Sequence, residues 1–184
     1  MEAPLVIDCS KLKVSFQPKP PRLVRWGFHP SPYHHLMIGL TPEGAICRIE
    51  FAKTRKPAAI LKEWQKAWPQ TQFEQDKEAT AKALEGILKK RAMPKIEISG
   101  TTKFQQDVWK TMLKIPAGKT LSYAEVARKI KRPKAVRAVG TACGANPVPV
   151  LIPCHRIVGS NGGLGGFGGG LPLKRQMLEM EKAA

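Results

Sequence analysis

Prolines break an apolar segment from Asn146 to Arg156, and they constrain the fold more than any other feature of the chain. Pro149 and Pro153 cannot donate to a sheet ladder, which makes a plain central strand here unfavourable. The segment ends in Cys154, His155 and Arg156. Adjacent side chains of an extended strand point to opposite faces, so Cys154 and His155 can act together only if the backbone bends or a water joins them.

The cysteine of this segment has two interpretations. A thiol beside an imidazole and a guanidinium is where a thiolate forms, because positive neighbours lower a cysteine pKa of about 8.5. On this view Cys154 is a nucleophile with a depressed pKa. Most free cysteines, however, are inert core residues, and a Cys-His pair alone does not decide between the two.

The overall charge points to a polyanionic partner. The chain has 184 residues, a net charge of +17 and a pI near 10.1, and nucleic acid is the first candidate for a chain of this kind. The alternative is a basic protein with no such partner. There is no CxxC pair, no signal peptide and no apolar run long enough for a membrane span, which predicts a reduced, intracellular protein; the cysteines are Cys9, Cys47, Cys143 and Cys154.

The first hundred residues predict a small antiparallel sheet with helices. Residues 1–32 are rich in proline and lysine and indicate a loosely ordered lead-in with one strand at about 11–17. A β-hairpin is expected over 33–51, with Cys47 on its buried face. Helices follow at 57–68 and 77–91, then a strand at 95–98. The residues that could form a zinc site are His29, His34, His35, Cys9 and Cys47. Their spacing fits no zinc-ligand pattern, so we predict no metal.

The second half predicts a helix-turn-helix. An amphipathic helix spans 102–113. Ser122 and Glu125 form a capping box for a helix over 123–130. Residues 131–133 break that helix, and 134–143 form the next, which is the layout of a helix-turn-helix.

Charge is concentrated on this motif. Residues 101–184 contain 14 Lys or Arg against 4 Asp or Glu, and six of the basic residues lie between Arg128 and Arg137. A merely solvated face usually intersperses both signs, so the run favours DNA binding. The second helix of the motif carries mostly small side chains, which can approach a DNA backbone but cannot read base edges.

A glycine-rich loop follows the cysteine segment. Residues 159–170 contain eight glycines, and a helix is expected immediately afterwards, over 171–182. A flexible linker has this composition. A loop tied at both ends can instead bring its backbone close to a flat ligand.

The segment Asn146-Pro-Val-Pro-Val-Leu-Ile-Pro-Cys-His-Arg-Ile-Val-Gly159 resembles the active-site segment of the O6-alkylguanine-DNA alkyltransferases, also called methylated-DNA–protein-cysteine methyltransferases. The resemblance is strong over roughly 104–181 and loose before that. It implies an α+β protein. An N-terminal α/β roll, ribonuclease H-like, would span 1–100, and a mainly helical, winged-helix-like domain for DNA binding and alkyl transfer would span 101–184.

The resemblance also implies a catalytic set. Cys154 would accept the alkyl group, His155 would act as general base through a water, and Glu181 would orient His155. Asn146 would brace the active-site turn, and Arg156 would hold local structure. From the sequence alone, Glu181 cannot be distinguished from a surface glutamate.

A second implied set binds the substrate. Arg137 would enter the duplex in place of the extruded base, and Tyr123 would press on the phosphate and meet the base edge. Without the resemblance, the alternative for Arg137 is a phosphate contact, and the alternative for Tyr123 is an ordinary core tyrosine. Many relatives have a tyrosine or tryptophan and a serine where this chain has Phe167-Gly168-Gly169. The pocket wall here lacks those side-chain hydroxyls, so contacts there must come from the backbone. The remaining expected members are Lys134, Ala135 and Ile157.

The function expected from the resemblance is DNA repair by direct reversal. Its partner would be double-stranded DNA containing O6-alkylguanine, with O4-alkylthymine a poorer substrate. Transfer would be stoichiometric, without cofactor or metal. The protein would be a monomer with no membrane partner, cytoplasmic near the nucleoid or, in a eukaryote, nuclear. The alternatives are a non-catalytic alkyltransferase-like lesion binder, which would lack the cysteine, and a thiol hydrolase, whose oxyanion-hole signals are missing here.

Overall fold

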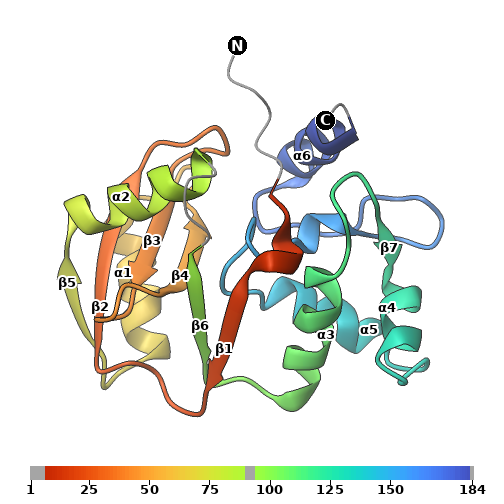
Figure 1. The fold of residues 1–184 in the computed structure, drawn as a ribbon, viewed down its shortest axis with the longest axis horizontal. Helices are drawn as coiled ribbons and strands as arrows, with labels where there is room; N and C mark the ends of the chain where they lie inside the picture. The colour runs from red at the N-terminus through yellow and green to blue at the C-terminus, as the bar shows by residue number, and fades with distance from the viewer. Residues whose placement is uncertain (1–6, 90–93, 183–184) are drawn as a thin grey trace. The chain divides into compact units, whose positions relative to one another are not determined.

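The computed structural model describes residues 7–89 and 94–182, and its elements are labelled in Figure 1. The chain divides into two compact units. One is Lys13–Thr101, and the other joins Met1–Leu12 to Thr102–Ala184. The predicted first domain, residues 1–100, therefore differs from the first unit at its start, because Ile7–Leu12 belong with the C-terminal unit.

The unit Lys13–Thr101 is built on one six-stranded sheet with the order β1-β6-β4-β3-β2-β5. Strands β2, β3 and β4 pair antiparallel, as the hairpin prediction requires, but β1–β6, β4–β6 and β2–β5 pair parallel. The sheet is thus mixed rather than antiparallel. Its strands are β1 (Lys13–Gln17), β2 (Leu23–His29), β3 (Leu36–Leu40), β4 (Ile46–Phe51), β5 (Gln72–Gln75) and β6 (Lys95–Ser99).

Strand β2 corrects the prediction of a loosely ordered lead-in over residues 1–32 for the part that the structure describes, while residues 1–6 lie outside the described residues. Val24, Trp26 and Phe28 alternate along one face of β2; Val24 is fully buried in the core and the other two pack against it. Alternation of this kind indicates a strand. The prolines on both sides of residues 23–29 obscured it. Strand β5, which pairs with β2, is too short and polar to have been predicted.

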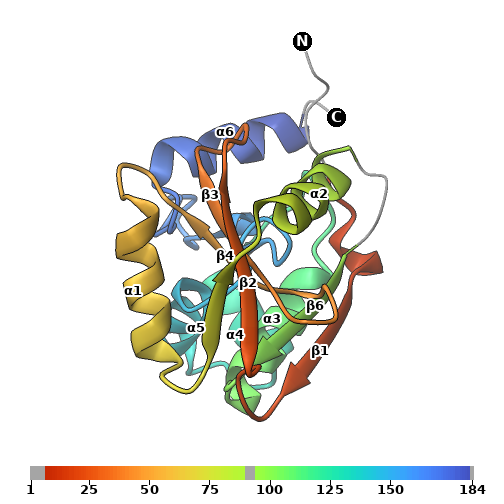
Figure 2. The ribbon, with the colours of Figure 1, turned by 90° about the vertical axis from the view of Figure 1, so that its left-hand side faces the viewer.

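Two helices cover this sheet (Figure 2). Helix α1 (Pro57–Ala67) buries Ile60 and Trp64 in the same core as Val24. Helix α2 (Lys77–Leu88) packs on β2 at Gly27, where an added Cβ would lie 1.9 Å from Thr80 Oγ1. Val24 and Gly27 point to opposite faces of the strand, so the two helices lie on opposite faces of the sheet. Only glycine permits the close approach of α2.

The second unit contains the predicted helix-turn-helix. Helices α3 (Lys103–Leu113) and α4 (Tyr123–Lys129) both begin with capping boxes, the second formed by Ser122 and Glu125 as predicted. Helix α5 (Val136–Gly144) packs against both of them. Trp109 Nε1 donates to the Ala142 carbonyl of α5 at 2.9 Å. The core beneath the motif is therefore fixed by both apolar packing and a buried hydrogen bond.

Short elements connect the motif to the cysteine segment. Strand β7 (Leu121–Ser122) pairs in parallel with β8 (Ile157–Val158), which follows the 3₁₀ turn η2 (Cys154–Arg156). This pairing brings the start of α4 next to β8, the strand that follows the turn containing Cys154. Helix α6 (Leu171–Lys182) packs on η2, and a further 3₁₀ turn, η1 (Cys9–Lys11), lies near the N-terminus.

Residues 7–89 and 94–182 contain neither a membrane-spanning helix nor a cluster of metal ligands. No helix in these ranges is both long enough and apolar enough to cross a bilayer. No group of three or more His, Cys, Asp or Glu side chains in them could hold a metal ion.

Candidate active site

The cysteine segment bends sharply, which is one of the two conditions for Cys154 and His155 to act together. Pro153 has φ −81° and ψ 65°, and the amide of Cys154 donates to the Ile152 carbonyl at 2.8 Å. These are the dihedral angles of an inverse γ-turn. The following residues form η2, and Cys154, His155 and Arg156 are all buried.

Asn146 braces this bend from the side. Its amide Nδ2 donates to the Ile152 carbonyl at 2.7 Å, and its Oδ1 accepts from the amide of Val148 at 3.0 Å. One side chain therefore spans the proline-rich stretch from end to end. The resemblance implies that Asn146 braces the active-site turn, and these are the contacts through which it would do so.

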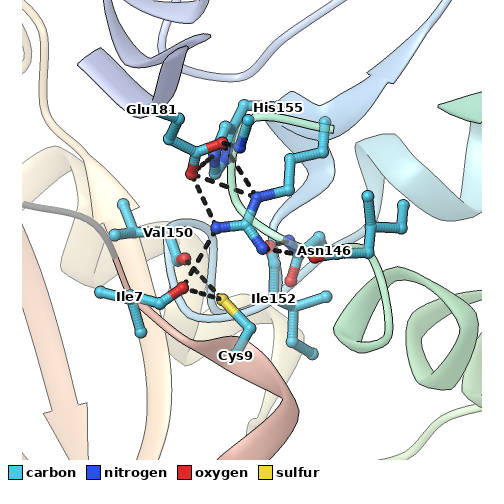
Figure 3. A network of polar contacts seen from close by, with 10 residues as sticks. Ile7, Cys9, Asn146, Val150, Ile152, His155 and Glu181 are labelled. Atoms are coloured by element: carbon cyan, nitrogen blue, oxygen red, sulfur yellow. Dashed lines mark hydrogen bonds and ion pairs between the residues drawn. The ribbon is translucent and has the colours of Figure 1, made fainter. Parts of the chain in front are cut away.

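A buried network of hydrogen bonds joins His155 and Arg156 of the turn to Glu181 of α6 (Figure 3). His155 Nε2 donates to Glu181 Oε1 at 2.9 Å. Arg156 donates through Nε to both carboxylate oxygens at 3.1 Å and through Nη2 to Oε1 at 2.7 Å. The side chains of His155, Arg156 and Glu181 are 2%, 1% and 5% exposed. Glu181 is thus no surface glutamate, and Arg156 holds it in place.

The carboxylate fixes the tautomer of the histidine. Burial by itself raises the pKa of Glu181, but its hydrogen bonds to His155 and Arg156 lower that pKa to about 2. An ionised carboxylate only accepts hydrogen bonds, so His155 Nε2 carries a proton. Burial lowers the pKa of His155 more than Glu181 raises it, and the ring is neutral near pH 7. Nδ1 then has a lone pair, and it has no hydrogen-bond partner among the described residues. His155 can therefore accept a proton at Nδ1.

The expected depression of the Cys154 pKa is wrong for the resting protein. Burial raises this pKa above its ordinary value of 9.0, although a hydrogen bond with Asn146 and the charge of Lys174 act in the opposite direction. The neighbouring guanidinium of Arg156 is occupied by Glu181 instead of the thiol. The resting pair is therefore a neutral thiol and a neutral imidazole, and a thiolate forms only when the proton leaves.

Lys174 is a site residue that the sequence analysis missed. It is fully buried, and its Nζ donates to the Ile157 carbonyl at 2.5 Å, to the Leu164 carbonyl and to the Gly166 carbonyl at 3.4 Å. It ties the glycine-rich loop to β8. A signal existed: Lys174, Leu178 and Glu181 share one face of α6 by helical spacing, and that face is buried.

Tyr123 and the glycine-rich loop lie against each other. A Cβ on Gly165, whose φ is +66°, would lie 2.5 Å from the Tyr123 hydroxyl, and one on Gly140 would lie 3.8 Å from its ring. The tyrosine ring therefore lies between α5 and the loop. Phe167 is half-buried, with its ring edge-on to His155 at a centroid distance of 6.4 Å. Of its two neighbours, Gly168 is exposed and Gly169 is buried, while Ile157 is fully buried.

The remaining predicted DNA contacts lie on the helix-turn-helix. Lys134 and Arg137 are exposed, at the turn and in the first turn of α5. Ala135 is the N-cap residue of α5 and is half-buried. A hollow of about 440 Å³ at the turn is lined by Arg132, Pro133, Lys134 and Ala135. This surface is basic, and small side chains predominate along α5.

The sequence of this chain is similar to those of known methyltransferases. Residues 103–183 match the family model "6-O-methylguanine DNA methyltransferase, DNA binding domain". The inducible methylated-DNA–protein-cysteine methyltransferase of Bacillus subtilis is 42% identical over 135 residues, covering 73% of this chain and 72% of that protein. The Haemophilus influenzae enzyme is 38% identical over 155 residues, 84% of each chain. The Mycobacterium bovis enzyme is 51% identical over 88 residues, which span about half of it, 53%.

The fold of this chain is also similar to solved structures of O6-methylguanine methyltransferases. The crystal structure of Mycobacterium tuberculosis OGT in complex with DNA matches with a TM-score of 0.67 and 32% identity, over 88% of this chain and 93% of that one. The crystal structure of the Mycobacterium tuberculosis O6-methylguanine methyltransferase matches with a TM-score of 0.69.

Fold and site together define a DNA-repair protein that has a buried cysteine beside a helix-turn-helix. The chain belongs to the methylated-DNA–protein-cysteine methyltransferases. The resemblance seen in the sequence is confirmed, and so are the α+β fold class and the function of DNA repair by alkyl transfer. The non-catalytic alternative would lack the cysteine that this chain has at position 154.

Proposed function

We propose that this protein extrudes O6-alkylguanine from duplex DNA and moves its alkyl group irreversibly to Sγ of Cys154, once per protein molecule. O4-alkylthymine would be a poorer substrate. The transfer forms a sulfur–carbon bond and breaks the carbon–O6 bond of guanine. The thiol proton passes through a water to His155 Nδ1, and the imidazolium then returns it through water to the departing guanine anion, so no net proton is gained or lost. The protein would act as a monomer in the compartment that contains the DNA.

The observation that carries this proposal is the histidine tautomer. Glu181 accepts from Nε2, which leaves Nδ1 as the basic nitrogen, and the pKa of His155 lies below its ordinary value. A buried neutral thiol is inert until a base removes its proton. Glu181 would stabilise the imidazolium that forms, and Arg156 keeps Glu181 in place.

The DNA-binding roles follow from position. The basic helix-turn-helix would bind phosphates through Lys134 and approach the backbone at Ala135. Arg137, exposed on α5, would fill the gap left by the extruded base. Tyr123 and the loop at Phe167, Gly168 and Gly169 would enclose the base, with Ile157 beneath. Extrusion is required because a base within a duplex is out of reach of a buried thiol.

The test is a mass spectrum after incubation with duplex DNA containing O6-methylguanine. We expect one added methyl group, on the peptide that contains Cys154. Cys154→Ser should take up none and still bind duplex. Cys143→Ser is the matched control, a second buried cysteine of the same unit, and should be methylated normally. Label on Cys143 or turnover beyond one equivalent would refute the proposal.

A further inference from the structure

The N-terminal residues contact the active-site network directly. Arg156 Nη2 donates to the Ile7 carbonyl at 3.1 Å, across 149 positions of sequence, and Nη1 donates to the Ile115 carbonyl at 2.6 Å (Figure 3). Together with Glu181, these two carbonyls surround the guanidinium. Ile7 therefore supplies one of three anchors for the residue that holds Glu181 beside His155.

The same segment covers a strained residue. Val150, four positions before Cys154, has φ +76°. A β-branched side chain rarely adopts this conformation, which costs about 1–3 kcal/mol and persists only where the surroundings impose it. The Cys9 thiol points at the Val150 carbonyl, with an Sγ–O distance of 4.0 Å, and lies 3.5 Å from the Ile7 carbonyl. Cys9 thus packs against the carbonyl group of the strained residue.

Residues 7–12 form an ordered turn with buried apolar side chains. Asp8 caps the turn η1 by accepting from the amide of Ser10 at 3.2 Å. Ile7, Cys9 and Leu12 are 7%, 1% and 9% exposed. A capped turn with three buried apolar side chains is a packed part of the C-terminal unit.

We propose that Ile7–Leu12 is a positioning clamp for alkyl transfer. It keeps Val150 in its left-handed conformation and Arg156 on Glu181, and thereby places Cys154 relative to His155. This inference rests on the proposed role of Cys154 as acceptor. Without the clamp, Val150 would relax to negative φ and redirect the chain that leads into the γ-turn at Pro153. A misplacement of about 1 Å costs on the order of 100-fold in rate.

Truncation tests the clamp. One protein begins at Ile7, which removes only residues outside the described range, and another begins at Leu12. Single-turnover transfer is measured at saturating protein on O6-methylguanine duplex, together with duplex affinity and the thermal midpoint. The first should match the full chain. The second should lose about 10- to 100-fold in rate, while its duplex affinity changes by less than about threefold, because the basic surface of α4 and α5 is intact.

A double-mutant cycle separates positioning from general stability. Glycine adopts positive φ without strain, so Val150→Gly should need the clamp less. We expect truncation to cost at least about fivefold less rate in the Val150→Gly protein than in the parent, a non-additivity typical of coupled sites. Val148→Gly is the control: it removes a buried valine without a positive φ and should give no rescue.

The possible results distinguish failure of the clamp from failure of the proposed function. Equal rate losses in the parent and Val150→Gly backgrounds, or an unchanged rate in the protein that begins at Leu12, would overturn the clamp. If that protein does not fold, the cycle is run with Cys9→Ala in the full chain, where a loss of about threefold is expected and no loss refutes the clamp. A parent protein that is never methylated on Cys154 would instead refute the proposed function.

Discussion

Two groups of cations in the C-terminal unit have opposite surroundings. The six basic residues between Arg128 and Arg137 are all exposed. Arg156 and Lys174 are 1% and 0% exposed. Carbonyl and carboxylate oxygens surround Arg156, and carbonyl oxygens surround Lys174. The exposed group is available to a ligand, whereas the buried group is committed within the protein. Burial and hydrogen-bond partners, more than residue type, therefore decide whether a positive charge in this unit can bind a ligand.

The largest expected effect comes from removing a buried cation. Arg156→Met leaves the Glu181 carboxylate buried without its strongest partner, and breaking such a pair costs about 3–5 kcal/mol. Arg132→Met is the matched control on the exposed group; its guanidinium lies over the Phe104 ring at 5.9 Å, and exposed interactions of this kind contribute about 1 kcal/mol or less. Denaturant unfolding compares the two. Equal losses would contradict the distinction between the groups.

The buried network also predicts an acid-labile part of the stability. The folded pKa of Glu181, about 2, lies below its ordinary value of 4.5. A depressed carboxyl pKa stabilises the fold above the unfolded pKa, and this stability is lost as the pH falls toward the folded pKa. The free energy of unfolding should therefore fall between pH 4.5 and 2. Glu181→Gln should flatten that part of the curve, and parallel curves for the two proteins would argue against a buried, ionised Glu181.

What the sequence predicts well is local. The capping box at Ser122 and Glu125 and the helical spacing of α6 depend on near neighbours, and they predicted elements that the structure contains. Pro149 and Pro153 likewise made a plain strand unfavourable, but a bend and a bridging water stayed open as alternatives until the γ-turn at Pro153 was seen. For the site, the motif identified Cys154 and His155 without any fold.

What could not be predicted depends on distant partners. The anchor of Arg156 at Ile7 spans 149 positions and uses a backbone carbonyl, which has no sequence signature. The raised pKa of Cys154 results from burial, while its neighbours in sequence predicted the reverse. The prolines of residues 1–32 indicate a loosely ordered lead-in, and this pattern concealed both β2 and the turn at Cys9.

A smaller effect should distinguish Arg137 from its exposed neighbours. If Arg137 replaces the extruded base, Arg137→Lys keeps the charge but loses the planar fork that stacks and donates within the duplex. Flipping costs a few kcal/mol in a duplex and less for an unpaired base. Transfer should fall about 10- to 100-fold on duplex, less on a mismatch, and hardly at all on free O6-methylguanine. Equal losses on all three substrates would show that Arg137 is no intercalating residue.

The smallest effect is expected for Lys134, which the proposed function treats as a phosphate contact. Each phosphate contact changes the slope of log affinity against log salt by about 0.9, because binding releases condensed counterions. Lys134→Ala should reduce that slope by about one contact, on lesion and undamaged duplex alike, with an unchanged transfer rate at saturating protein. Lys182→Ala, an exposed lysine at the end of α6, is the control and should leave the slope unchanged. A loss confined to lesion DNA would mean that Lys134 acts on the extruded base, and the exposed group would then not be a uniform phosphate-binding surface.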